Sequence, residues 1–242
     1  LQQLVDTLNG PVSGFWAGQT DGAIRLSVRA AVDLRAAPTV AGCEDPAALW
    51  EEVGRRIGWT RAPRQHLLVH LPAGASSCSV GLAEVGPHRT AGGRVYVRTA
   101  APTVLAHELG HNFGLGHSSA VQCDRQVETG ACQVTPYADW YDIMGISWSE
   151  AGSLNAVHAA QLGVLPAGDV VSVGPDTPPT AFTLSPVGAA TGTRAVRLAA
   201  ADGSVYWLEY RAPVGLDSWL GTPVPELARA AVRGGGPPGR RG

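Results

Sequence analysis

Apolar residues recur at helical spacing in two stretches of the first sixty residues. Leu1–Leu8 carries them one turn apart, which predicts a short helix. Asp45 is a favoured N-cap residue and Pro46 suits the first helical position, so a second helix is expected from there to about residue 57. A helix with one apolar stripe is typical of a helix that lies on a sheet. The stripe consists of Leu49, Trp50, Val53 and Ile57.

Strand patterns lie between and after these helices. Apolar and polar residues alternate over Ile24–Val32, which predicts a strand. His66–Leu71 reads as a buried strand that Pro72 stops. Ser76–Gly92 is rich in Gly and Ser and predicts a loop. Gly93–Arg98 is a short strand with polar ends, as in an edge strand.

In the second half of the chain, the sequence pattern changes from helices and a long loop to short strands. A helix is expected to open at Ala101–Thr103, a loop to run from about Gly116 to Gly145, and a helical stretch to lie near Leu154–Leu162. From Gly168 onward, short apolar segments are separated by Gly, Pro and Asp, which predicts strands and turns. The expected strands are Asp169–Val173, Ala181–Leu184, Ala195–Ala199 and Val205–Arg211.

These patterns predict three parts. Residues 1–165 alternate strands with helices, so their fold class is α/β (α+β), with a mixed sheet. Residues 166–233 form a small all-β appendage, which is incomplete if its strands run directly into the tail. Residues 234–242 contain only Gly, Pro and Arg and are expected to be disordered.

Composition and charge exclude several classes of protein. The chain has 242 residues, 45% of them hydrophobic, which is enough for a sizeable core. Its net charge of −2 and the absence of a basic stripe exclude a nucleic-acid partner. No apolar run approaches the roughly 20 residues of a membrane span. No signal peptide is present, and we expect one to have been removed. We expect a monomer.

The four cysteines predict disulfides. Three pairings are possible. Cys123 and Cys132 share one polar stretch, so they are the favoured pair, which leaves Cys43 with Cys78. The short bridge would add roughly 2–3 kcal/mol in the chain-entropy model. Four free buried thiols in a cytosolic protein are the alternative, and disulfides instead predict an exported, extracellular protein.

The segment from His107 to His117 carries the chemistry. Residues four apart lie on one helix face, so His107 and His111 can both face one metal ion. Glu108 is rotated off that direction and is placed to reach a water at the metal. Gly114 can end the helix in a left-handed conformation, and His117 then returns as the third ligand. Three protein ligands with one open position are typical of catalytic zinc. The alternative is a helix whose histidines are buried in a core.

A second motif follows at residues 141–145, Tyr-Asp-Ile-Met-Gly. Met144 is the only methionine of the chain and comes fewer than thirty residues after His117. A methionine by itself is more often core filler than anything else. Its place after the three histidines nevertheless matches a methionine-containing turn beneath a zinc site.

Together these motifs resemble those of the metzincin metallopeptidases, which share His-Glu-x-x-His-x-x-Gly-x-x-His and a Met-turn. The resemblance covers roughly residues 1–165 and is greatest to the gametolysin-like branch and its bacterial relatives. Three features indicate this branch: Ser118 after the third histidine, the Asp-Ile-Met-Gly turn, and the strand Trp207–Arg211. Astacin-like and serralysin-like enzymes place Tyr two residues after the Met, where this chain has Ile146, so no tyrosine ligand is expected there.

The resemblance implies roles for individual residues. His107, His111 and His117 would bind one zinc ion, Glu108 would be the general base, and Met144 would support the site without coordinating. A peptide substrate would add as a strand along Val95, Tyr96 and Val97. Residues 137–142, with Tyr137 and Tyr141, would wall the pocket for the residue after the cut. Calcium is conceivable at Asp139 and Asp142, but turn and capping roles are favoured.

The expected function is that of a secreted zinc endopeptidase acting on a protein or peptide substrate. Two alternatives stay open at this stage. One is a related protein that keeps zinc but no longer cleaves, against which the intact Glu108 argues. The other is a zinc hydrolase that acts on a non-peptide amide.

Overall fold

The computed structural model describes residues 1–35, 38–125, 129–146 and 149–222. The chain divides into two compact units, of which the first is Leu1–Ala167 and the second begins at Gly168. This division falls close to the boundary predicted at residue 165. Residues 223–233 of the predicted appendage and the predicted tail 234–242 lie outside the described residues.

The first unit combines helices with two small sheets, so the predicted mixed α/β class is confirmed. No helix among the described residues is both long enough and apolar enough to cross a membrane. The elements of this unit are α1 (Gln2–Thr7), η1 (Leu8–Val12), α2 (Ser13–Gln19), α3 (Pro46–Ile57), β1 (His66–His70), β2 (Gly81–Ala83), β3 (Gly93–Val97), α4 (Pro102–Asn112), β4 (Ala120–Cys123), β5 (Cys132–Thr135) and α5 (Ala156–Gln161).

The main sheet is mixed, as predicted, with the strand order β1-β3-β2. Strand β3 pairs parallel with β1 and antiparallel with β2. The prediction that Gly93–Arg98 is an edge strand is therefore wrong. Arg94, at the polar start of β3, forms an ion pair with Glu84 at 2.6 Å and is only partly exposed. The prediction of a loop throughout Ser76–Gly92 is also wrong, because β2 lies within it. The strand has only three residues, which is too short for an alternating pattern to reveal it.

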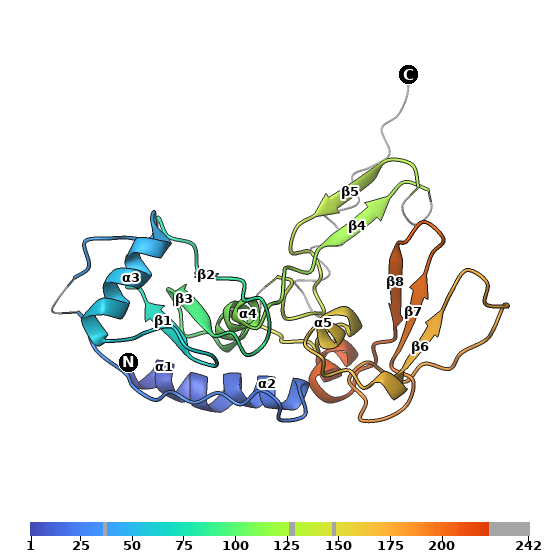
Figure 1. Cartoon of the computed structure of the whole chain (residues 1–242), viewed down its shortest axis with the longest axis horizontal. Coiled ribbons are helices and arrows are strands. Elements are labelled where there is room, and N and C mark those ends of the chain that lie inside the picture. Colours follow the sequence, from blue (N-terminus) through green and yellow to red (C-terminus); the bar gives the residue numbers. More distant parts are fainter. Residues whose placement is uncertain (36–37, 126–128, 147–148, 223–242) are drawn as a thin grey trace, which may run out of the picture. The chain divides into compact units, whose positions relative to one another are not determined.

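The two faces of this sheet bury separate cores. Val95 and Val97 of β3 belong to a cluster with α4, whereas Tyr96 belongs to a cluster with α3. This division follows from the two-residue period of a strand, which sends alternate side chains to opposite faces. Figure 1 shows α4 beside the sheet. Helix α4 therefore packs through apolar side chains on the Val95 and Val97 face of the sheet.

The N-terminal helix is longer than predicted. Helices α1 and α2 are joined by the π-helical turn η1, and the three form one rod through Gln19 in Figure 1. Pro11 lies inside η1, where a wider turn accommodates it. Val12 and Trp16, beyond the predicted end at Leu8, are fully buried, so core packing continues the helix.

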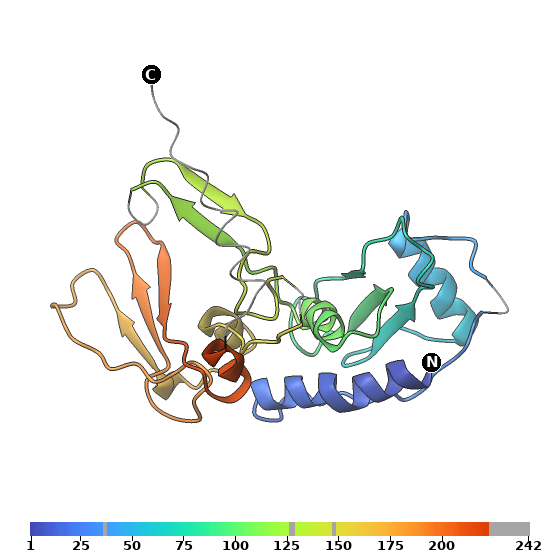
Figure 2. The same cartoon turned by 180° about the vertical axis from the view of Figure 1, so that it is seen from behind.

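The segment Ile24–Val32 forms no strand and pairs with none of the described strands, so the strand prediction for it is wrong. It runs back along the N-terminal rod, as both views show (Figures 1 and 2). Side chains of the rod accept its backbone N–H groups at 2.8–3.1 Å, in place of a neighbouring strand. These bonds join Val28 to Asn9, Leu26 to Ser13 and Ile24 to Thr20.

Helix α3 has the predicted bounds and both predicted disulfides are present. The Asp45 side chain accepts from the Ala48 N–H at 3.0 Å, as expected of an N-cap. The disulfide Cys43–Cys78 links the chain just before α3 to the loop between β1 and β2. The disulfide therefore links two segments that border the core between α3 and the sheet.

A hairpin occupies part of the predicted loop between Gly116 and Gly145. Its strands β4 and β5 pair antiparallel, with Cys123 opposite Cys132. That pair forms the second disulfide. The hairpin has few buried positions, so it shows no hydrophobic alternation that a sequence pattern could reveal.

The second unit contains a three-stranded sheet of order β6-β7-β8. The predicted segment Ala181–Leu184 is not a strand; the neighbouring Pro186 forms only an isolated bridge with Tyr210. The elements are η2 (Ala167–Asp169), β6 (Val170–Val173), β7 (Ala195–Ala199), β8 (Val205–Glu209) and η3 (Gly215–Gly221).

Candidate metal centre

Helix α4 carries two of the predicted ligands. Ala101 is extended at its N-cap and Pro102 occupies the first turn, where a missing N–H costs no hydrogen bond. His107 and His111 follow one turn apart, and both are buried. Because the helix is buried on nearly all sides, the two imidazoles are held in a fixed place relative to the sheet.

The end of α4 returns the chain towards its own histidines. Gly114 has a φ of 99°, in the left-handed region that favours glycine. The Leu115 N–H bonds to the Gly110 carbonyl at 3.1 Å, which closes the turn. A β-carbon at Gly114 would lie 3.0 Å from the Gly86 carbonyl oxygen, so the position is also crowded. The sharp turn brings His117 back over the helix.

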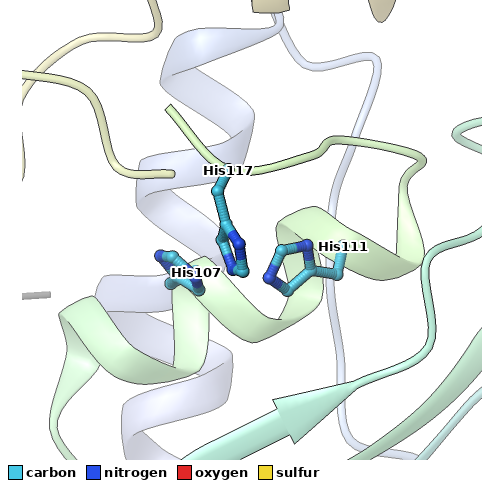
Figure 3. A group of neighbouring side chains, drawn as sticks. All are labelled: His107, His111 and His117. Carbon is cyan, nitrogen blue, oxygen red and sulfur yellow. The ribbon is translucent and has the colours of Figure 1, made fainter. Parts of the chain in front are cut away.

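The three histidines converge in space, as Figure 3 shows. One ligand atom from each of His107, His111 and His117 lies within 4.8 Å of the other two. His107 and His111 are buried, and His117 is exposed. Within the described parts of the chain, no other three His, Cys, Asp or Glu residues come together in this way.

Two backbone carbonyls orient the buried ligands. His107 Nδ1 lies 2.8 Å from the Ile143 oxygen, and His111 Nδ1 lies 2.8 Å from the Leu115 oxygen. A carbonyl oxygen can only accept, so each Nδ1 carries the proton and each Nε2 is left with a free lone pair. Hydrogen bonding of the second ring nitrogen is the usual way in which proteins orient a metal-binding histidine.

Burial favours the neutral form of all three histidines at neutral pH. Desolvation lowers the pKa of His107 to about 4, and it also lowers the pKa values of His111 and His117. Only neutral imidazole can bind a metal ion. The donor set therefore fits a metal: three neutral nitrogens, two of them oriented, around one point. These three residues could hold a metal ion, as predicted.

Comparisons with protein-family models, with curated proteins and with solved structures find no match to this chain. Its chemistry is therefore inferred from the geometry and the environment of the site.

Glu108 lies beside the histidines but outside the metal-binding cluster. The residue is 7% exposed, and burial raises the pKa of its carboxyl group to about 7. It packs against Gly81 of β2, where a β-carbon would lie 2.7 Å from the Glu108 Cδ. A buried carboxyl group with a pKa near neutrality can both take and release a proton at physiological pH.

Met144 lies beneath helix α4. Its side chain is fully buried, and a β-carbon at Gly110 would collide with the Met144 sulfur. Gly110 stands between the two ligands of α4, so the methionine packs directly behind them. The Met144 oxygen accepts from the Ser118 N–H at 2.9 Å, which ties the turn to the residue after His117.

A buried polar network holds this turn, and two of its members, Asn155 and His158, were not predicted as site residues. Asp142 Oδ1 accepts from the Met144 N–H at 2.7 Å and from His158 Nδ1 at 3.1 Å, and Asp142 Oδ2 accepts from the Asn155 N–H at 2.5 Å. The predicted capping role of Asp142 is thereby confirmed. Asp139 acts similarly, because its Oδ1 accepts from the Tyr141 N–H. His158 carries no motif that could have marked it.

The predicted substrate-binding residues divide into two groups. Val95, Tyr96 and Val97 lie buried in the central strand β3, and both of its edges are already paired, so the prediction that a peptide adds along them is wrong. Tyr137 lies against the metal site, with its ring centroid 3.9 Å from that of His117. Tyr141 is 42% exposed, and its role as a pocket wall stays a prediction.

Proposed function

We propose that this chain is a secreted zinc-dependent endopeptidase of the metzincin type. The observation that carries the proposal is the convergence of His107, His111 and His117 beside the buried carboxyl group of Glu108. Three neutral imidazoles suit zinc, and a three-ligand site keeps a position open for a substrate or a water. When bound, zinc would supply Lewis acidity, which lowers the pKa of water and polarises a carbonyl group.

Glu108 is the residue that moves the proton in this proposal. As a carboxylate it takes a proton from the attacking water, and as a carboxylic acid it gives that proton to the leaving amine. Both roles require a carboxyl group that changes its protonation state easily near neutral pH. The burial of Glu108, which raises the pKa of its carboxyl group to about 7, supports that assignment.

Strand β2 replaces β3 as the proposed rim of the substrate cleft. It is the edge strand beside β3, and its Gly81 contacts Glu108. An extended peptide bound along its outer edge would gain main-chain hydrogen bonds, as in strand addition. Leu82 in the middle of β2 is 38% exposed, so this strand is not covered by the core on all sides.

The covalent structure supports the proposed secretion. The two disulfides would not persist in the reducing cytosol, where glutathione and thioredoxin keep cysteine thiols reduced. We therefore propose an extracellular site of action, with a protein or peptide as the substrate.

The test is the metal content of the purified protein together with cleavage of casein, with and without a chelator. We expect one zinc per chain, cleavage that the chelator abolishes, and recovery on addition of zinc. Glu108→Gln should keep the zinc and lose at least about a hundredfold in turnover. Glu51→Gln, on the exposed face of α3, is the matched control and should cleave like the wild type.

Each other outcome has a distinct meaning. Zinc without cleavage of any protein substrate would favour a binding protein or a hydrolase of non-peptide amides. Folded protein without zinc would contradict the three-histidine site itself. Full activity of Glu108→Gln would contradict the assignment of the base.

A further inference from the structure

The three candidate ligands are not held in the same way. His107 and His111 each donate Nδ1–H to a backbone carbonyl at 2.8 Å. Within the described residues, neither ring nitrogen of His117 has a hydrogen-bond partner. His117 is also the one exposed ligand of the three. Some other contact must therefore set the plane of its ring if it is to bind a metal in a defined direction.

That contact is the ring of Tyr137. The two ring centroids lie 3.9 Å apart, with 44° between the planes. The same tyrosine ring lies 6.3 Å from the ring of His107, nearly parallel to it. Among the described residues, the other rings near His117 are those of His107 and His111, which are candidate ligands themselves. In the described part of the chain, Tyr137 is thus the aromatic side chain that meets His117 from outside the set of candidate ligands.

The backbone at Tyr137 adopts a conformation that disfavours a tyrosine. It follows Pro136 in a turn closed by the Ala138 N–H on the Thr135 carbonyl at 3.3 Å. Tyr137 has a φ of 60°, in the left-handed region where glycine or asparagine is preferred at this place of a turn. A strained residue persists where its surroundings hold it, and such residues cluster at functional sites. The turn thereby aims a large ring at His117 where a glycine would fold more easily.

We propose that Tyr137 is a positioning residue of the metal centre. Its ring, rather than its hydroxyl group, fixes the orientation of His117 and takes the place of the carbonyl acceptor that the other two ligands have. This inference rests on the metal-binding part of the proposed function. It deepens that function by giving the β4–β5 hairpin, whose last strand leads into Tyr137, a part in building the site.

The test compares the zinc affinity of three variants with that of the wild type, measured by competition with a chromogenic chelator. Tyr137→Gly removes the ring and suits the turn, so the metal-free variant should unfold at the same temperature as the wild type or higher. Its zinc dissociation constant should rise about ten- to a hundredfold, as on loss of other groups that orient a ligand. Tyr137→Phe keeps the ring and should bind zinc like the wild type.

Arg64→Gly is the matched control, because Arg64 also has a left-handed φ, of 61°, but belongs to no metal-binding cluster. It should leave the zinc affinity unchanged. Wild-type affinity in Tyr137→Gly would overturn the proposal. An equal loss in Tyr137→Phe would overturn it as well, because the hydroxyl group would then carry the effect. Failure of the wild type to bind zinc would overturn both this inference and the proposed function. Zinc binding by the wild type together with unchanged affinity in Tyr137→Gly would overturn this inference alone.

Discussion

Gly81 of the edge strand β2 and Glu108 of helix α4 are in direct contact: a β-carbon at Gly81 would lie 2.7 Å from the carboxyl carbon of Glu108. Real side chains do not approach so closely, so any residue but glycine at 81 would displace the carboxyl group. The carboxyl group of Glu108, the proposed base, therefore fills the space that a side chain at position 81 would take.

Gly81→Ala should consequently separate metal binding from catalysis. The added methyl group pushes the Glu108 carboxyl group aside while His107, His111 and His117 keep their places. We expect zinc content to be unchanged and turnover to fall about a hundredfold, the size of effect that a small misplacement of a catalytic group can cause. Steady-state cleavage kinetics and metal analysis check both parts.

Gly74→Ala is the control for Gly81→Ala, because a β-carbon at Gly74 meets no atom within 4 Å. It should cleave like the wild type. Unchanged turnover in Gly81→Ala would mean that Glu108 has room to move or is not the base. Loss of zinc would mean that β2 supports the ligands as well.

Removing the charge of Glu108 should stabilise the metal-free protein at neutral pH. Burial raises the pKa of this carboxyl group from 4.5 to about 7. Between these values the folded chain binds more protons than the unfolded chain, so stability falls as the pH rises. The difference between the two pKa values corresponds to about 3 kcal/mol above pH 7.

Urea unfolding of metal-free Glu108→Gln, compared with the wild type, tests this pH dependence. The variant should be more stable by up to about 3 kcal/mol above pH 7, and the advantage should vanish well below pH 4.5, where both states bind the proton. The same advantage at both pH values would show that the gain does not come from ionisation of Glu108.

Asp142→Asn should loosen the turn beneath the metal site. The carboxylate accepts from two backbone N–H groups and from His158, and an amide has only one acceptor oxygen for them. A buried donor left unpaired costs about 1–3 kcal/mol. Because the same turn supplies the carbonyl that orients His107, zinc affinity should fall about tenfold as well.

Denaturant unfolding and chelator competition measure the two effects of Asp142→Asn. Asp202→Asn, an exposed turn residue of the second unit, is the control and should change neither. Wild-type zinc affinity in a destabilised Asp142→Asn protein would limit Asp142 to a structural role.

The two disulfides should differ in their contribution to stability. Cys43 and Cys78 are separated by 35 residues, and Cys123 and Cys132 by 9. In the chain-entropy model the longer loop stabilises by about 4 kcal/mol and the shorter by about 2–3 kcal/mol. Replacement of each pair by alanine, followed by urea unfolding, should therefore show the greater loss for Cys43 and Cys78. The reverse order would indicate that contacts of the native hairpin outweigh loop entropy.

Local sequence patterns were sufficient to predict the parts of the fold that depend on residues close together in the chain. The bounds of α3 follow from its cap and its apolar stripe, and the placing of His107 and His111 on one face follows from helix geometry. Gly114 at the helix end and both disulfide pairs were likewise predicted. Each of these features is decided within a turn of helix or by a small number of possible pairings.

Packing between segments far apart in the chain decided how the strands pair. The hydrogen-bond partners of a strand lie far away in the chain, so β3 became a central strand despite its polar ends, and Ile24–Val32 found side chains of the N-terminal rod instead of a sheet.

The sequence by itself determined which residues make up the proposed site: three histidines, one glutamate and a methionine. Only the tertiary structure decided what surrounds them. It brought the Ile143 carbonyl to His107, Gly81 to Glu108 and Tyr137 to His117. The physical reason is that spacing along one helix fixes the direction of its side chains, whereas their partners come from separate segments that meet only when the core is packed.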